Sequence, residues 1–283
     1  GKEVTTGIRN TIIGGLAGDA INTGTENTLV GYKAGSALTT GQYNVGLGAF
    51  ALESEDAHGR NIAIGYYALQ TQDAGADAYN IGIGHAAGAS VTTGTQNVLI
   101  GGLTGDALTT GQYNVAIGGN ALSAEDAHSY NTAVGYNALR LQNAGADAYN
   151  VALGYNAGEN ISTGTSNVLL GSQAGDALTT GSHNVAIGRG ALGGEDGDGR
   201  NVAVGHEALN AQNVGQAGYN VSMGYEAGHD VSDGKQNTII GGLAGDALTT
   251  GDNNIIIGYN AAASAVDVDN EITLGNANIS AFR

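Results

Sequence analysis

Residues 114–122 read NVAIGGNAL, and this stretch is one copy of a unit that fills nearly the whole chain. The unit is an Asn, two or three apolar residues, a Gly, two variable residues and an Ala. It recurs in steps of 17, 17, 17 and 19 residues, so a superperiod of 70 residues contains four copies. The first residues of the copies are Asn10, Asn27, Asn44, Asn61, Asn80, Asn97, Asn114, Asn131, Asn150, Asn167, Asn184, Asn201, Asn220, Asn237 and Asn254, with a distorted copy at Asn270. A fixed period of this kind is typical of a repeat architecture.

Composition narrows the class of protein further. The chain has 283 residues, of which 50 are Gly, and contains no Pro, Cys or Trp. Periodic Gly without Pro argues against collagen and against low-complexity disorder, and the lack of Cys excludes a disulfide scaffold. A formal net charge of −17 disfavours contact with nucleic acid. We therefore expect no nucleic-acid partner. No apolar run reaches membrane-spanning length, so we also expect no membrane insertion.

The start of each unit predicts a short β-strand. Counting from the Asn as position 0, position 1 is Val, Ile or Thr, position 3 is aliphatic or Met, and position 4 is always Gly. β-Branched runs that end in Gly favour strands, whereas each recurring Gly would cost a helix about 1 kcal/mol. A unit of 17 residues could hold one strand, a tight turn, a second short strand and a return loop. We therefore predict an all-β, parallel β-roll or β-solenoid of about 15 coils of 17–19 residues.

This prediction divides the chain into three parts. Residues 1–9 form a lead-in segment, residues 10–269 form the repeat, and residues 270–283 form a C-terminal segment.

The repeated Asn is best explained by stacked side-chain ladders and turn capping.

The second half of the unit varies with the superperiod. The first two coils of each block have Gly at position 8 and an aliphatic residue at position 11, as in Gly105 and Leu108. The last two coils have Leu at position 8, so we expect one inward aliphatic residue per coil. The third coil carries acidic pairs, which we interpret as a solvated face: Glu55-Asp56, Glu125-Asp126 and Glu195-Asp196. The fourth coil carries two extra residues, which predicts longer loops on one face.

Position 2 bears on the oligomeric state. On a strand it points opposite to positions 1 and 3, and it is never charged, so the strand is apolar on both faces. A long exposed apolar stripe calls for a partner. We therefore expect a parallel homo-oligomer with position 2 near its axis. The predicted interface residues are Leu29, Leu99, Leu169, Ile239, Ala116 and Ala186.

The repeat resembles known adhesive proteins. The sequence Asn-Val-Ala-Ile-Gly, followed by two residues and Ala, resembles the head repeats of YadA-type trimeric adhesins, which are parallel β-rolls. The 17-residue form with Thr-Thr-Gly before the next Asn, as at 109–111, is similar to repeat regions of bacteriophage tail fibres. Residues 271–280, EITLGNANIS, are similar to the segment that leads into the intramolecular chaperone domain of such fibres and of endosialidase tailspikes. The resemblance implies a homotrimer, two further copies being the partners, with an adhesive or receptor-facing role.

Candidate receptor contacts lie at the fourth-coil insertions. Tyr79, Tyr149 and Tyr219 close these insertions, and Asp77 and Asp147 lie two residues before the first two of them. Tyrosines beside polar loops could stack on sugar rings, because a Tyr has a flat apolar face and a polar tip. They could equally cover the ends of the core. We predict that these loops project outward and contact a host surface glycan or a protein receptor.

Other chemistries find little support in the sequence. No nucleophile–base pair is visible, so we expect no catalytic residues and no enzyme. No cofactor is expected, because the glycines around Gly82 belong to the repeat rather than to a phosphate-binding loop. The six His lack metal-binding spacing, so no metal site is expected, although a three-fold axis could turn one residue into three ligands.

Three functions therefore remain open. The first is a phage tail fibre segment, acting as shaft and adhesin in the virion. The second is the head of a trimeric adhesin on the bacterial surface. The third is an ice-binding solenoid, which would require a regular Thr array that only some coils supply.

Overall fold

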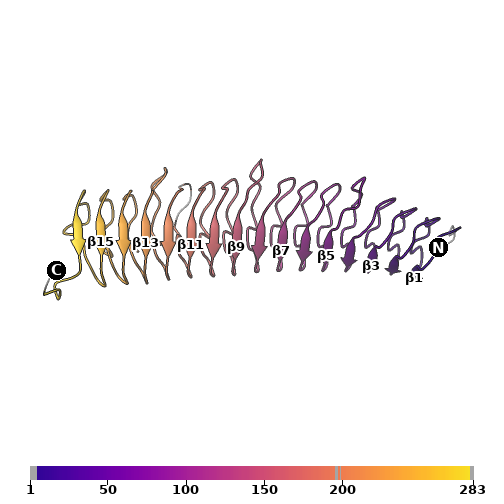
Figure 1. Cartoon of the computed structure of the whole chain (residues 1–283), viewed down its shortest axis with the longest axis horizontal. Helices are drawn as coiled ribbons and strands as arrows, with labels where there is room; N and C mark the ends of the chain where they lie inside the picture. The colour runs from indigo at the N-terminus through magenta and orange to yellow at the C-terminus, as the bar shows by residue number, and fades with distance from the viewer. Residues whose placement is uncertain (1–4, 195–196, 198, 281–283) are drawn as a thin grey trace. The chain divides into compact units, whose positions relative to one another are not determined.

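The computed structural model describes residues 5–194, 197 and 199–280 of the chain. It divides into two compact units, Gly1–Ala148 and Tyr149–Arg283. Each unit is a parallel β-solenoid, and no helix occurs in the residues just given (Figure 1). The predicted all-β solenoid of about 15 turns is therefore confirmed.

Each turn of the solenoid contributes one strand of three residues. The first unit contains β1 (Thr11–Ile13), β2 (Thr28–Val30), β3 (Val45–Leu47), β4 (Ile62–Ile64), β5 (Ile81–Ile83), β6 (Val98–Ile100), β7 (Val115–Ile117) and β8 (Thr132–Val134). The second unit contains β9 (Val151–Leu153), β10 (Val168–Leu170), β11 (Val185–Ile187), β12 (Val202–Val204), β13 (Val221–Met223), β14 (Thr238–Ile240), β15 (Ile255–Ile257) and β16 (Ile272–Leu274). β1 to β15 occupy positions 1 to 3 of their units, as predicted, whereas β16 occupies positions 2 to 4 of the distorted copy that begins at Asn270.

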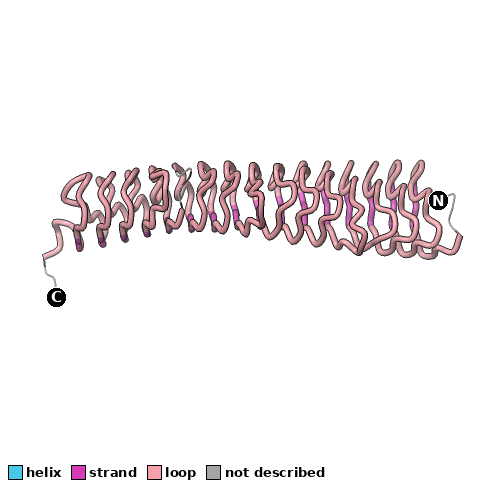
Figure 2. The backbone as a smooth tube through the Cα atoms, turned by 90° about the horizontal axis from the view of Figure 1, so that it is seen from above, coloured by secondary structure: helices cyan, strands magenta, loops and turns pink. Residues whose placement is uncertain are grey.

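Within each unit, successive strands pair in parallel and in register. In β6 and β7, for example, Leu99 lies opposite Ala116. Figure 2 shows the strands aligned along one side of each unit, with loops and turns completing every coil. The sheet includes β16, which pairs in parallel with β15. The C-terminal segment from residue 270 therefore contributes one more strand to the sheet.

The second strand predicted for each coil is absent from the described residues, and left-handed backbone conformations explain why. Phe50 and Leu52, at positions 6 and 8, have φ of 63° and 52°, which a strand does not accommodate. Backbone hydrogen bonds nevertheless continue from coil to coil, since Phe50 N–H donates to Tyr32 O at 2.9 Å and Leu52 N–H donates to Ala68 O at 3.2 Å. The wall opposite the sheet is thus a stack of hydrogen-bonded turns.

The Gly at position 4 is required by close stacking of the coils. Gly101 has φ of +140°, and a Cβ built on it would lie 2.5 Å from the carbonyl oxygen of Gly118 in the next coil. Other residue types would meet both an unfavourable backbone conformation and a collision.

The repeated Asn forms the expected ladder. Asn97 is buried, its backbone N–H donates to Asn80 Oδ1 at 2.8 Å, and its Nδ2 donates to Gly111 O at 2.9 Å. Its own Oδ1 accepts from the backbone N–H of Asn114 at 3.0 Å. Asn97 therefore satisfies backbone groups of neighbouring coils that would otherwise be buried without partners.

The prediction that position 2 lines an interface between chains is wrong. Leu99 is 0% exposed within a single chain, and the same holds for the other five residues assigned to that interface. Leu29, Leu169, Ile239, Ala116 and Ala186 are each fully buried in their own solenoid. Their side chains fill the interior between the sheet and the turns, where they cannot contact another copy.

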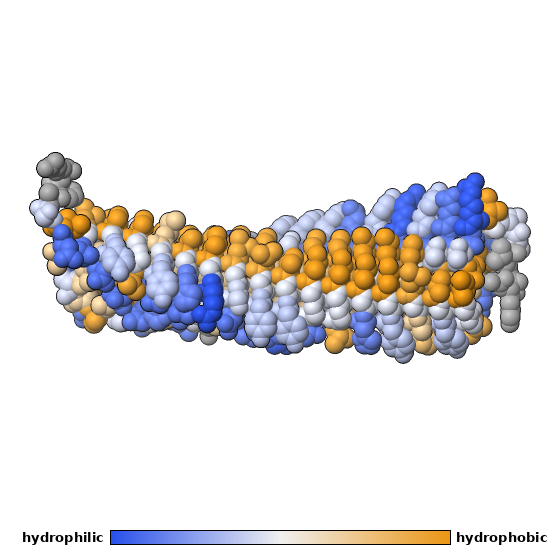
Figure 3. All heavy atoms as spheres, turned by 90° about the horizontal axis from the view of Figure 1, so that it is seen from below, coloured by the Kyte–Doolittle hydropathy of each residue, from blue (hydrophilic) through white to orange (hydrophobic). Residues whose placement is uncertain are grey.

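Positions 1 and 3 instead form the outward face of the sheet. Ile117 is 36% exposed, and Leu153, Met223, Ile240 and Ile257 are also exposed large apolar residues at position 3. Figure 3 shows apolar side chains gathered in bands along one face of each unit. An apolar stripe is therefore present, as predicted, but on the opposite face of the strand.

Candidate functional site

The fourth-coil insertions project from the solenoid. The loops that follow β4, β8 and β12 rise above those of neighbouring turns (Figure 1). At their turns Gly75, Gly145 and Gly215 have φ between 65° and 71°, and a Cβ on each would meet no atom within 4 Å. Ala76 and Asp77 of the first loop are exposed. The prediction that these loops point outward is therefore confirmed.

The tyrosines that close the loops are exposed but do not lie at the tips. Tyr79, Tyr149 and Tyr219 are 53%, 55% and 53% exposed. Each directly precedes a ladder Asn and has φ of 52–54°. We call the residues at this position, one before each Asn, the pre-Asn row. Each of these tyrosines lies two residues before the first strand residue, and its exposed side chain lies on the outer surface of the solenoid.

The pre-Asn row of the first unit stacks flat side chains on one another. Arg60 lies between two rings, with its guanidinium carbon 5.1 Å from the ring centroid of Tyr43 and 5.6 Å from that of Tyr79. Farther along, the rings of Tyr113 and Tyr130 are parallel within 6° at a centroid distance of 5.2 Å. Such cation–π and aromatic contacts order the rings into a pre-formed surface. In the second unit Arg200 lies over Tyr219 at 5.7 Å.

The two predicted loop carboxylates point back toward the preceding coil. Asp77 Oδ1 accepts from the backbone N–H of Gly59 at 3.1 Å, and its Oδ2 forms an ion pair with Arg60. Asp147 Oδ1 accepts from the backbone N–H of Ser129 at 3.2 Å. Both carboxylates therefore tie the base of a loop to the turn before it, which leaves the tyrosines as the more accessible part of the predicted contact.

A second row of exposed aromatic residues was not predicted. It occupies position 5, directly after the strand-ending Gly, and we call it the post-Gly row. Its tyrosines are Tyr32, Tyr66, Tyr136, Tyr155, Tyr225 and Tyr259, all exposed. Histidines in the same row stack on them, with ring centroids 5.7 Å apart for Tyr66 and His85 and 5.2 Å apart for His206 and Tyr225. The recurrence of Tyr at one position of the repeat was the signal available in the sequence.

The acidic pairs of the third coil are only partly solvated, contrary to prediction. Glu55 and Glu125 are 0% exposed, whereas Asp56 and Asp126 are exposed. Burial raises the pKa of Glu55 to about 7 and also raises the pKa of Glu125. The third pair, Glu195-Asp196, lies outside the described residues.

The fold brings carboxylates and His together in ways that their spacing did not reveal. Three groups have potential ligand atoms within 4.8 Å of one another: Glu55, His58 and Asp73; Glu125, Asp126 and His128; and His206, Glu207 and Glu226. Hydrogen bonds within the turn account for both oxygens of Glu55. Glu55 Oε1 accepts from the backbone N–H of His58 at 3.0 Å, and its Oε2 accepts from Asn61 Nδ2 at 3.2 Å. Glu55 thus supports the Asn ladder from inside the turn.

Glu125 makes the corresponding contacts with His128. Its Oε1 accepts from the His128 backbone N–H at 3.0 Å and lies 2.6 Å from Nδ1 of the same residue. These bonds identify the buried Glu of the third coil as a cap for its own turn. The expectation that the chain holds no metal stays a prediction.

The described residues contain no helix suited to crossing a membrane. Comparison with protein-family models, curated proteins and solved structures found no match to the chain.

Proposed function

We propose that the chain is an adhesive segment of a phage tail fibre that binds a repeating surface glycan through many weak, equivalent contacts. The observation that carries this proposal is the recurrence of a projecting loop and an exposed Tyr at the same place in successive blocks. Spaced equivalent sites on a stiff scaffold suit multivalent binding, in which avidity replaces single-site affinity. The head of a bacterial surface adhesin would use the same geometry.

The proposal includes a parallel homotrimer. Its physical support is the outward apolar face of the sheet, including residues such as Ile117 and Ile257, which are 36% and 37% exposed. An apolar stripe that recurs on every strand favours association with an equally regular surface, and another copy of the chain supplies one. The number three comes from the resemblance to trimeric adhesins and tail fibres.

The adhesive role can be tested by removing the tyrosines of the insertions. The variant Tyr79→Ala/Tyr149→Ala/Tyr219→Ala should bind a glycan array or an immobilised lipopolysaccharide at least tenfold more weakly, because three equivalent contacts are lost per chain. Tyr113→Ala is the control, since Tyr113 occupies the pre-Asn row without an inserted loop and its ring stacks on Tyr130. Equal binding by the triple variant and the wild type would refute the assignment of adhesion to these loops.

A further inference from the structure

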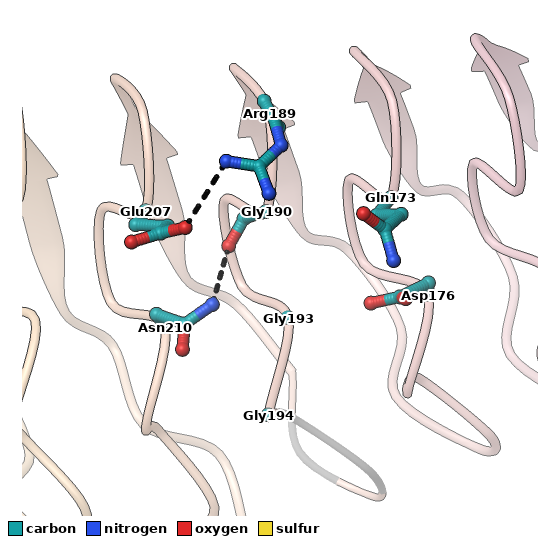
Figure 4. Close-up of a pocket in the computed structure, with 8 residues that line it drawn as sticks. All are labelled: Gln173, Asp176, Arg189, Gly190, Gly193, Gly194, Glu207 and Asn210. Atoms are coloured by element: carbon teal, nitrogen blue, oxygen red, sulfur yellow. Dashed lines mark hydrogen bonds and ion pairs between the residues drawn. The ribbon is translucent and has the colours of Figure 1, made fainter.

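One turn of the second unit has a hollow beside three glycines that the equivalent earlier turns do not carry. The coil that begins with β11 has Gly190, Gly193 and Gly194, whereas the equivalent coil one block earlier has Asn120, Ser123 and Ala124. Loss of these side chains leaves a hollow of about 340 Å³ between neighbouring turns (Figure 4). The local departure from the repeat is not needed for stacking, since the earlier block stacks with the larger residues.

Polar side chains surround this hollow from three successive turns. Gln173 and Asp176 come from the turn before it, and Glu207 and Asn210 come from the turn after it. Arg189 lies on the rim, with its guanidinium 3.4 Å from Glu207 Oε1 (Figure 4). All five groups can donate or accept hydrogen bonds, and none of the described residues that line the hollow is aromatic or a large aliphatic.

Two polar side-chain atoms face Gly193, one of them a donor and the other an acceptor. A Cβ built on Gly193 would lie 2.8 Å from Asn210 Nδ2 and 3.6 Å from Asp176 Oδ1. Asn210 is held in place, because its Nδ2 donates to Gly190 O at 2.9 Å. Burial also raises the pKa of Asp176, so this carboxyl group is partly shielded from water. A ligand in the hollow beside Gly193 would therefore meet oriented polar partners.

The lining excludes several classes of ligand. An apolar ligand would find no apolar wall, and an anion would be repelled by the carboxylates of Asp176 and Glu207. Glu207 is already paired with Arg189, so a bare cation would find one lining carboxylate, Asp176, without a cationic partner, which is fewer oxygen ligands than a divalent ion requires. A neutral polyol remains, because its hydroxyl groups both donate to carboxylates and accept from amide and guanidinium N–H groups. The volume lies near the lower end of the range for small-molecule sites.

We propose that this hollow binds one neutral, hexose-sized sugar residue. The inference deepens the proposed function and rests on it for the biological source of the sugar, which would be a unit of the bound glycan. The hollow differs from the tyrosine loops in chemistry, because it would recognise hydroxyl groups individually instead of stacking on a ring face. It would therefore add selectivity for one sugar to an otherwise permissive adhesive surface.

The test measures monosaccharide binding by the whole chain. Ligand-observed NMR titration with D-glucose, D-galactose, D-mannose and N-acetyl-D-glucosamine should reveal binding of at least one of them. The variant Gly190→Asn/Gly193→Ser restores the residues of the earlier block and should raise the dissociation constant at least tenfold. Its fold is expected to survive, because Asn120 adopts φ of 55° at the position where Gly190 has φ of 63°. Circular dichroism checks this, and Asn210→Ala, which removes a lining donor without filling the space, should also weaken binding.

A matched control opens the earlier turn. Asn120→Gly/Ser123→Gly creates space in the first unit, but that turn offers Leu103 and Gly119 where Gln173 and Arg189 stand, so sugar binding should not increase. Failure of all four sugars to bind, or equal binding by the filled variant, would overturn the inference. Binding of calcium in place of sugars would overturn it as well.

The two proposals fail separately. If the hollow binds no sugar while the triple tyrosine variant binds the glycan more weakly than the wild type, the sugar-site inference is refuted and the proposed function is supported. If a monosaccharide binds in the hollow but no surface glycan is bound by the wild type, the proposed function falls and the hollow remains a sugar site.

Discussion

Replacing Glu55 with Gln should remove a loss of stability that the wild-type turn undergoes between about pH 5 and pH 7. Glu55 is 0% exposed, and burial raises its pKa from 4.5 to about 7. The folded turn therefore retains a proton over a pH range in which the unfolded chain has released it. The stabilising contribution is fully present below the unfolded pKa and is lost as the pH rises through the folded pKa.

The size of the effect follows from the difference between the two pKa values. One pKa unit corresponds to about 1.4 kcal/mol, so a shift of this size amounts to about 3 kcal/mol. The backbone N–H of His58 and the amide of Asn61 both donate to this carboxylate, and they keep the loss from being larger once the group ionises.

Gln is a suitable replacement because the protein already uses it at the same position of the next turn. Gln72 is buried at position 11, where its Oε1 accepts from Asn80 Nδ2 at 2.6 Å. The Glu55→Gln side chain can accept from Asn61 in the same way. The variant should therefore be comparable to the wild type near pH 5 and more stable than it near pH 8.

Hydrogen exchange measured by mass spectrometry suits this test, because solenoid turns open locally. Opening free energies of residues 55–62, corrected for intrinsic exchange, should fall with rising pH in the wild type and stay level in the variant. Glu53→Gln is the control, since hydrogen bonds from Gln70 and Lys33 outweigh partial burial and lower the pKa of Glu53. That variant should retain the wild-type slope. A wild-type opening free energy that is flat or rises with pH would refute the reasoning.

Three other perturbations test the fold and the oligomer. Leu99→Asp should destabilise each chain by several kcal/mol in urea unfolding, because it buries an unpaired charge, whereas Ile117→Asp should preserve the circular dichroism spectrum and lower the mass measured by light scattering. Similar behaviour of the two variants would contradict the assignment of the two strand faces. Asn97→Ala should cost roughly 2–5 kcal/mol, since two buried backbone groups lose their partners, and an unchanged urea midpoint would argue against the ladder. Deleting Gly75 and Ala76 should change stability by less than about 1 kcal/mol, and a larger loss would mean that the loop supports the turn.

The strands could be predicted because the same Asn–apolar–Gly pattern recurs at a fixed spacing along the chain. Any single run such as that of β3 is too short to distinguish from a buried loop, but the same pattern at the same spacing in every copy leaves one interpretation. The Gly at position 4 could be predicted on the same grounds, although its physical reason, the close approach of Gly101 to Gly118, depends on how coils stack.

The candidate site was predicted in part. The projecting loops follow from an insertion that stacking does not need, and length alone reveals that. Asp77 and Asp147 accept hydrogen bonds from backbone N–H groups that lie 18 residues earlier, in the preceding turn. No local sequence pattern predicts these hydrogen bonds. The burial of Glu55 was missed because an acidic pair was treated as one solvated feature, although the inward position 11 had been identified from other turns.

The wrong assignment of the strand faces has a physical cause that the sequence itself could have corrected. Both faces are apolar, so hydrophobic periodicity cannot tell which one is inside. Size is more informative than hydrophobicity here, because residues that share an enclosed space must have complementary volumes.

Positions 2 and 8 have such complementary volumes. The coils with Leu99 and Leu169 at position 2 have Gly105 and Gly175 at position 8, whereas the coils with Ala116 and Ala133 have Leu122 and Leu139. In the structure these positions face each other across the interior: a Cβ on Gly105 would lie 2.9 Å from Leu99 Cδ2, so both positions cannot be large in one coil. Positions 1 and 3 show no such exchange with position 8. An exchange of volume between two positions of a repeat thus identifies the inner face of a solenoid strand even where both faces are apolar.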